Sequence, residues 1–178
     1  LAATVDYQGT RLGLDATLQQ SATESVTAKG SVPTSLFKPS ASGEHVEPSP
    51  GDAMDLQIKT SAIDLAIVQG LTSQITNVAG TLEADVHLTG SGEDPHAQGF
   101  VDIKNGAFGI PAAGETFTGL TTRLELKSDA LEVREFQLLD RHGEKLRVAG
   151  ELAVHARQLG DVNVAIESNN FEVLNNEL

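Results

Sequence analysis

The feature that most limits how this chain folds is a long run of alternating side chains at residues 78–88, VAGTLEADVHL. Successive side chains of a β-strand point to opposite faces, so strict alternation of apolar and polar residues predicts a half-buried strand. At roughly 3.3 Å per residue this strand extends about 35 Å, longer than most strands. Its apolar face carries Val78, Gly80, Leu82, Ala84, Val86 and Leu88.

Turn-forming residues follow this strand. Gly90, Gly92 and Pro95 predict that the chain reverses, and Gly99, Val101 and Ile103 predict a returning strand, so the stretch forms one long hairpin. Asn105-Gly106 is a dipeptide typical of tight turns. We therefore expect a turn there, with Phe108 and Ile110 opening the next element.

The same alternation recurs along most of the chain, at residues 1–7, 12–18, 26–32, 54–58, 120–127, 131–138, 146–154 and 162–166. Pro33 is expected to end the third strand because proline cannot donate a hydrogen bond to a sheet. Leu131 and Val133 are out of phase with Phe136 and Leu138, which predicts a bulge near Arg134-Glu135. Residues 141–143 predict the next turn.

Two segments break the alternation. Residues 33–52 are rich in proline, serine and glycine, which predicts a loop or partly disordered insert. Ile63, Ile67 and Leu71 have helical spacing behind Thr60-Ser61 as possible caps, which predicts a short helix at about residues 63–70. A further buried strand is the alternative, because the segment contains β-branched residues.

These patterns predict an all-β fold with one short helix, built as an elongated, mostly antiparallel sheet. We divide it into N-terminal strands (1–32), the proline- and serine-rich loop (33–52) and the remaining strands (53–178), in one continuous domain. Because the sequence begins with Leu1 inside an alternating pattern, we expect an internal fragment of a larger protein. The sequence contains neither a signal-peptide pattern nor an apolar run long enough to span a membrane.

Charge and motif content exclude several functions. The formal charge of −13 repels phosphate backbones, so we expect no nucleic-acid partner. The sequence has no cysteine, no nucleotide-binding or hydrolase motif, and its five histidines are scattered. Glu93-Asp94 lacks the spacing of a calcium loop and is more simply a pair of turn residues. We expect no enzymatic activity, no metal and no cofactor.

The expected apolar face is unusual in its small residues, which include Ala16, Ala28, Gly30, Gly80, Ala84, Gly99 and Gly150. A closed sandwich normally fills its interior with large side chains. The small residues therefore indicate either room for a guest molecule or positions where the sheet bends sharply.

Several of these features together resemble one family. They are an apolar, helix-like segment before a G-x-L strand, the turn L-T-G-x-G-x-D-P, the edge N-G-x-F-x-I-P, the strand T-G-L-x-x-R-L and the closing R-V-A-G-E-L. In this order they resemble the repeat region of the TamB family, which is related to the AsmA-like proteins. The resemblance covers about residues 54–178.

The resemblance implies a sheet folded along its length into an open "β-taco" groove with an apolar interior. It also implies a periplasmic location, in a parent chain anchored in the inner membrane outside this fragment. The expected partners are phospholipid acyl chains, an outer-membrane barrel of the TamA type and flanking segments of the same parent chain. The expected role is outer-membrane biogenesis, including lipid movement and assembly of autotransporter-type proteins.

Two function classes remain open. In the first, the chain is a lipid-carrying segment of a bridge between the membranes. The groove-lining residues are then expected to be Leu82, Ala84, Val86, Leu88, Val101, Ile103, Leu124, Leu126, Val148 and Leu152. In the second, the same face is an ordinary closed core, and exposed edge strands dock partner strands or form a dimer.

Overall fold

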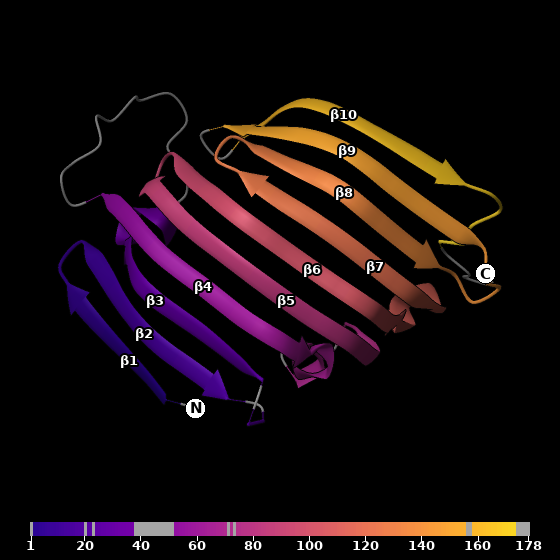
Figure 1. The fold of residues 1–178 in the computed structure, drawn as a ribbon, viewed down its shortest axis with the longest axis horizontal. Helices are drawn as coiled ribbons and strands as arrows, with labels where there is room; N and C mark the ends of the chain where they lie inside the picture. Colours follow the sequence, from indigo (N-terminus) through magenta and orange to yellow (C-terminus); the bar gives the residue numbers. More distant parts are fainter. Residues whose placement is uncertain are drawn as a thin grey trace.

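In the described part of the chain, ten antiparallel β-strands form a single open sheet in which every strand lies beside its neighbours in the chain (Figure 1). The computed structural model describes residues 2–19, 21–22, 24–37, 52–70, 72, 74–155 and 158–173. The order β1 to β10 follows the sequence without a crossover. The predicted all-β, antiparallel, open fold is therefore confirmed.

The elements have the following bounds. The strands are β1 (Ala2–Gln8), β2 (Arg11–Gln19), β3 (Ser25–Pro33), β4 (Ala53–Asp64), β5 (Thr76–Ser91), β6 (Pro95–Ile110), β7 (Glu115–Lys127), β8 (Ala130–Leu139), β9 (Lys145–His155) and β10 (Gln158–Ser168). Three short 3₁₀ helices connect some of them: η1 (Thr34–Phe37), η2 (Leu65–Gly70) and η3 (Pro111–Ala113).

The sheet has two ends, named here after the helices they carry. The η1 end, at the upper left of Figure 1, holds η1 and the turn between β5 and β6. The η2 end, at the lower right, holds η2, η3 and the turn between β8 and β9. Apart from η2 against β5, substantial contacts between described elements join only strands that are adjacent in the sheet.

The predicted long hairpin is confirmed and forms the middle of the sheet. Strands β5 and β6 are each 16 residues long. They are joined at residues 92–94, where the N–H of Ser91 donates to the carbonyl of Asp94 at 3.0 Å. The Ser91 hydroxyl also accepts a hydrogen bond from the N–H of Asp94 at 3.1 Å. Glu93 and Asp94 thus belong to the hairpin turn.

The turn expected at Asn105-Gly106 is wrong, because both residues lie inside β6. Asn105 has a φ of 52°, and the pairing with β7 shifts between Ile103 and Gly106. The left-handed conformation that asparagine tolerates therefore makes a β-bulge here instead of reversing the chain. The actual turn follows Pro111, whose carbonyl accepts a hydrogen bond from the N–H of Gly114 at 3.1 Å.

The predicted bulge in β8 is confirmed. Leu124 pairs with Val133 and Arg123 pairs with Glu135, so Arg134 is the extra residue. Phe136 then pairs with Thr122, which returns it to the face of Val133. The insertion of one residue explains why the apolar phase changes along this strand.

The helix expected at residues 63–70 is confirmed only from Leu65, as the 3₁₀ helix η2, because Ile63 and Asp64 belong to β4. Thr60-Ser61 does not cap it. The Ser61 hydroxyl instead accepts the N–H of Ser25 at 2.7 Å, and the Asp64 carboxylate accepts the N–H of Ala66 at 2.8 Å. Both sequence alternatives are therefore partly right, since strand and helix divide the segment between them.

The proline-rich segment begins as predicted. β3 ends at Pro33, whose side chain is fully buried, and η1 follows directly. Residues 38–51, the larger part of the expected loop, lie outside the described residues. Near η1, Val32, Met54 and Leu56 form a small buried cluster against which Leu36 packs.

Candidate functional site

The strand register brings the predicted groove-lining residues to one face of the sheet. Directly opposed residues of neighbouring antiparallel strands share a face. Leu82 pairs with Ile103, Ala84 with Val101 and Val101 with Leu124. Val86 and Leu126 both pair with Gly99, and Leu126 pairs with Leu131, which pairs with Leu152. Leu88 lies on the same face of β5, and Val148 on the same face of β9 as Leu152.

This apolar face extends well beyond the predicted residues. Leu88 pairs with Leu56, and Leu56 with Gly30, which carries the face onto β3 and β2. On the other side, Leu152 pairs with Val162. We define the apolar face by its aliphatic members on the remaining strands: Leu12, Leu14, Leu18, Val26, Ile58, Leu131, Val133, Leu146, Val162, Val164 and Ile166.

The middle of the apolar face is only partly covered. Of the predicted lining residues, Ala84 is buried at 8% exposure, whereas the others are intermediate. The large buried side chains lie near the ends of the strands, with Met54 near η1, Ile63 beside η2, and Phe117 and Leu138 at the η2 end. Among the described residues, no second layer packs over the strands, unlike in a closed sandwich.

Two threonines interrupt the aliphatic character of the face, and both have hydrogen-bond partners. The Thr60 hydroxyl accepts the N–H of Ala84 at 2.8 Å. The Thr122 hydroxyl donates to the carbonyl of Glu135 at 2.9 Å. The hydroxyl groups of both threonines are therefore engaged in hydrogen bonds within the sheet.

The glycines on this face are explained by the geometry of the sheet, which leaves no room for a Cβ. At Gly99, φ is 126°, and a Cβ would overlap the carbonyl oxygen of Asp85 on the next strand. A Cβ would also collide with neighbouring backbone at Gly30, Gly80 and Gly150. Close approach of the neighbouring backbone therefore explains these four glycines.

The opposite face is polar and lined with ion pairs. Lys59 contacts Asp85 at 2.9 Å, Arg134 contacts Glu125 at 2.7 Å, and His87 contacts Asp55 at 2.7 Å. The Lys59 ammonium holds the pKa of Asp85 below its usual value, and Glu125 raises the pKa of Arg134. Such half-exposed pairs contribute little stability each, but they keep charge off the apolar face. His87 is exposed as predicted, whereas the side chain of His155 lies outside the described residues.

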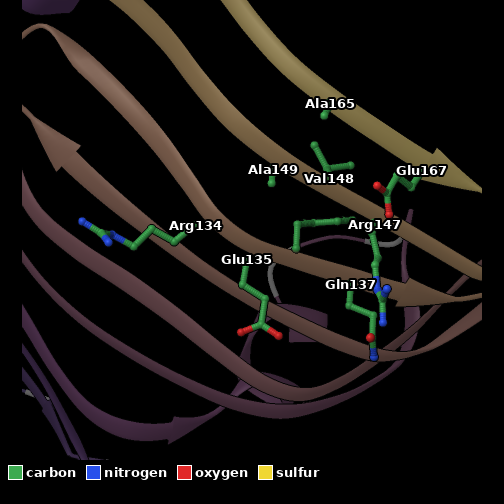
Figure 2. A pocket seen from close by; sticks show the side chains of 9 residues that line it. Arg134, Glu135, Gln137, Arg147, Val148, Ala149, Ala165 and Glu167 are labelled. Carbon is green, nitrogen blue, oxygen red and sulfur yellow. The ribbon is translucent and has the colours of Figure 1, made fainter.

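A cavity of about 320 Å³ opens where the pairing of β8 with β9 is interrupted (Figure 2). The register passes from Val133–Gly150 directly to Gln137–Arg147, which leaves Val148 opposite the gap. Gln137, Arg147 and Glu167 lie close together on its rim, one from each of three strands. The lining contains two arginines and two glutamates as well as Phe136 and Val148, which belong to the apolar face.

The η2 end carries a cluster that sequence reasoning missed. Phe117 is 4% exposed and lies between Phe108 and Phe171, at ring-centre distances of 5.3 and 5.7 Å. Phe171 belongs to residues 169–173, named here the tail, which follow β10. Phenylalanine occurs only six times in the chain, and the sequence contains no signal that brings these three together.

Polar groups fasten the tail beside this aromatic cluster. The N–H of Glu172 donates to the carboxylate of Asp140 at 2.8 Å, and the Glu172 carboxylate contacts Arg141 at 3.2 Å and His142 at 3.0 Å. Burial alone raises the pKa of Asp140. Backbone N–H groups of Glu172, Glu144 and His142 outweigh that effect and hold the pKa below its usual value. Asp140 is therefore ionised and holds the tail through the hydrogen bond from Glu172.

The outer strands leave apolar side chains exposed. Every residue of β1 is exposed, including Val5 and Tyr7 at 64% each. On β10, Val162 and Ile166 are 59% and 68% exposed. These strands have a neighbour on one side only, so both sheet edges are available for pairing in the described structure.

Comparisons with protein families, curated proteins and solved structures yield no match to this chain. Within the described ranges, no helix has the length and apolar character needed to cross a bilayer. The same part of the chain contains no group of three or more acidic or histidine side chains arranged to hold a metal ion. Functional inference therefore depends on the two faces and the edges of the sheet.

Proposed function

We propose that the chain binds phospholipid acyl chains on its apolar face. The supporting observation is a continuous, largely uncharged aliphatic face that spans β2 to β10 and stays partly exposed along its middle. Each methylene buried on such a surface contributes roughly 0.8 kcal/mol, so two long acyl chains gain substantial free energy there.

In this proposal the chain is one segment of a periplasmic bridge that carries phospholipid between the inner and outer membranes. The lipid head group remains in water, while the acyl chains lie against the strands. The resemblance to the TamB repeat region adds an outer-membrane barrel of the TamA type as partner and outer-membrane biogenesis as the process. Flanking segments of the parent chain extend the groove at the sheet edges.

The second candidate function is an interaction module that docks partner strands at its edges. The exposed, apolar edge strand β1 favours this candidate. In this case the apolar face is covered by protein, and lipid has no role.

Native mass spectrometry of the chain purified from a cell envelope separates the two candidates. Retained phospholipid in the folded protein supports the lipid-binding proposal. A lipid-free chain that also gains no mass when titrated with phosphatidylethanolamine in detergent contradicts it and leaves the edge-docking function.

A further inference from the structure

The tail covers an apolar site at the η2 end of the sheet. Phe108 and Phe117 lie on the apolar face. The register of β6 with β7 shows this, because it passes from Ile103–Thr122 through Gly106–Leu120 to Phe108–Phe117. Leu138, 7% exposed, lies on the same face of β8. The ring of Phe171 stacks on Phe117 at an angle of 15°. Phe171 therefore occupies a place where the apolar face would otherwise continue.

The tail has few attachments for a segment in this position. It forms no strand or helix, and its Val173 is 68% exposed. The described attachments are the ring stack of Phe171 and the contacts of Glu172 with Asp140, Arg141 and His142. Asn170, with a φ of 51°, supplies the bend by which the chain leaves β10.

A buried carboxylate beside the tail favours its release. Glu115 is 2% exposed, and neither of its oxygens has a hydrogen-bond partner among the described residues. Its nearest cation is Arg141, at 3.8 Å, and Arg141 lies closer to Glu172, at 3.2 Å. If Glu172 leaves, Arg141 can close on Glu115, which offsets part of the cost of losing the tail contacts.

We propose that the tail is a displaceable cover over an acyl-binding site formed by Phe108, Phe117 and Leu138, and that Phe171 holds the place of an acyl chain. Lifting the tail transfers Arg141 from Glu172 to Glu115 and extends the apolar face to the η2 end. This inference rests on the proposed lipid-binding function.

The test uses palmitic acid that carries a diazirine near its methyl end, photo-crosslinked to the folded chain and mapped by peptide mass spectrometry. In the unaltered chain, crosslinks are expected mainly on the middle of β5, β6 and β7. Phe171→Ala should raise crosslinking to the peptides that contain Phe117 and Leu138 about three- to ten-fold, the change expected from loss of one aromatic contact.

Two further variants sharpen the test. Glu172→Gln leaves the ring stack in place, removes the carboxylate that contacts Arg141 and His142, and should raise the same crosslinks, which covers the case in which Phe171→Ala does not fold. Val173→Ala alters an exposed neighbour and should leave the pattern unchanged. If folded Phe171→Ala and Glu172→Gln are crosslinked on the middle strands but not more strongly near Phe117, the proposal that the tail is a cover is overturned, while the lipid-binding proposal stands. Absence of crosslinks from every variant overturns both proposals.

Discussion

The backbone N–H of Glu172 donates a 2.8 Å hydrogen bond to the carboxylate of Asp140, a residue 32 positions earlier in the chain. This bond joins the segment after the last strand to the turn between β8 and β9. The other Asp140 oxygen accepts the N–H groups of His142 and Glu144, at 2.8 and 2.9 Å. One side chain thus organises its own turn with one oxygen and fastens the tail with the other.

Asp140→Asn should release the tail selectively. The amide oxygen can still accept the two turn N–H groups, but the amide nitrogen then faces the N–H of Glu172, which leaves two donors opposed. We expect a fall in melting temperature of several degrees and faster amide exchange in residues 171–173. Asp161→Asn, at an exposed position on β10, is the control and should change neither.

The stabilisation by Asp140 should also depend on pH. Because its pKa in the folded chain is lower than in the unfolded chain, its contribution is complete above the ordinary aspartate pKa. That contribution is lost as the pH falls through the lowered folded pKa. The difference in melting temperature between the unaltered chain and Asp140→Asn should therefore be largest near neutral pH and shrink as the pH falls below the ordinary aspartate pKa. An equal difference at neutral and at strongly acidic pH contradicts this role.

Val86→Arg should abolish phospholipid retention. Val86 pairs with Ile58 and Gly99 in the middle of the apolar face, so a guanidinium there is desolvated against aliphatic neighbours at a cost of several kcal/mol. His87→Arg adds charge one residue away, on the polar face, where the Asp55 carboxylate already contacts the His87 ring at 2.7 Å. Thermal unfolding must first show that both variants fold. If the chain is a segment of a periplasmic bridge, as proposed, Val86→Arg in the parent protein should weaken the outer-membrane barrier and reduce phospholipid crosslinking at Leu88, whereas His87→Arg should do neither. Normal lipid retention by folded Val86→Arg contradicts the groove at this position.

Gly99→Ala should destabilise the sheet. The residue has a φ of 126°, and an added Cβ would overlap the Asp85 carbonyl and approach the Val86 Cα to 3.2 Å. We expect a loss of about 1–3 kcal/mol in the free energy of unfolding, measured by urea titration. Gly13→Ala is a matched control inside β2, where the added Cβ meets Asp6 at an ordinary 3.6 Å. Its free energy of unfolding should stay the same or rise by up to about 1 kcal/mol.

The exposed edges should make the chain self-associate. Val5 on β1 and Ile166 on β10 are 64% and 68% exposed, and each belongs to a strand with one free side. Sedimentation at increasing concentration should show dimers or larger species, and Val5→Lys should shift this equilibrium toward the monomer. Strictly monomeric behaviour of the unaltered chain at high concentration contradicts edge pairing.

Much of the sheet was predictable because a strand whose two faces meet different surroundings leaves a period of two in the sequence. That pattern identifies the apolar side of Leu82, Val86 and Leu124 and even the bulge at Arg134, since an inserted residue shifts the phase. The pattern cannot predict a backbone conformation that leaves the burial of the side chains unchanged. Asn105 adopts the same left-handed conformation in a bulge as in a turn, so the dipeptide alone does not distinguish the two.

The cluster at the η2 end could not be predicted for a different reason. Glu115 and Asp140 flank turns, where acidic residues are normally solvated, yet both are buried, and Asp140 accepts a hydrogen bond from a tail that returns from β10. Contacts between segments so distant in sequence leave no periodic trace. The gap between β8 and β9 near Val148 likewise follows from how β8 pairs with both of its neighbours. The sequence of one strand alone does not contain this information.

The order of the strands has a consequence for how the chain unfolds. Since each strand packs on its sequence neighbours, the molecule resembles a one-dimensional array whose free energy is close to a sum of neighbouring interfaces. Such an array frays inward from its outermost members. β1, exposed along its whole length, should therefore detach first, whereas the hydrogen bond between Asp140 and the tail holds the opposite edge. Amide exchange should accordingly be slowest in β5 and β6. Protection should decrease toward both edges of the sheet, but unequally, with β1 losing protection well before β9.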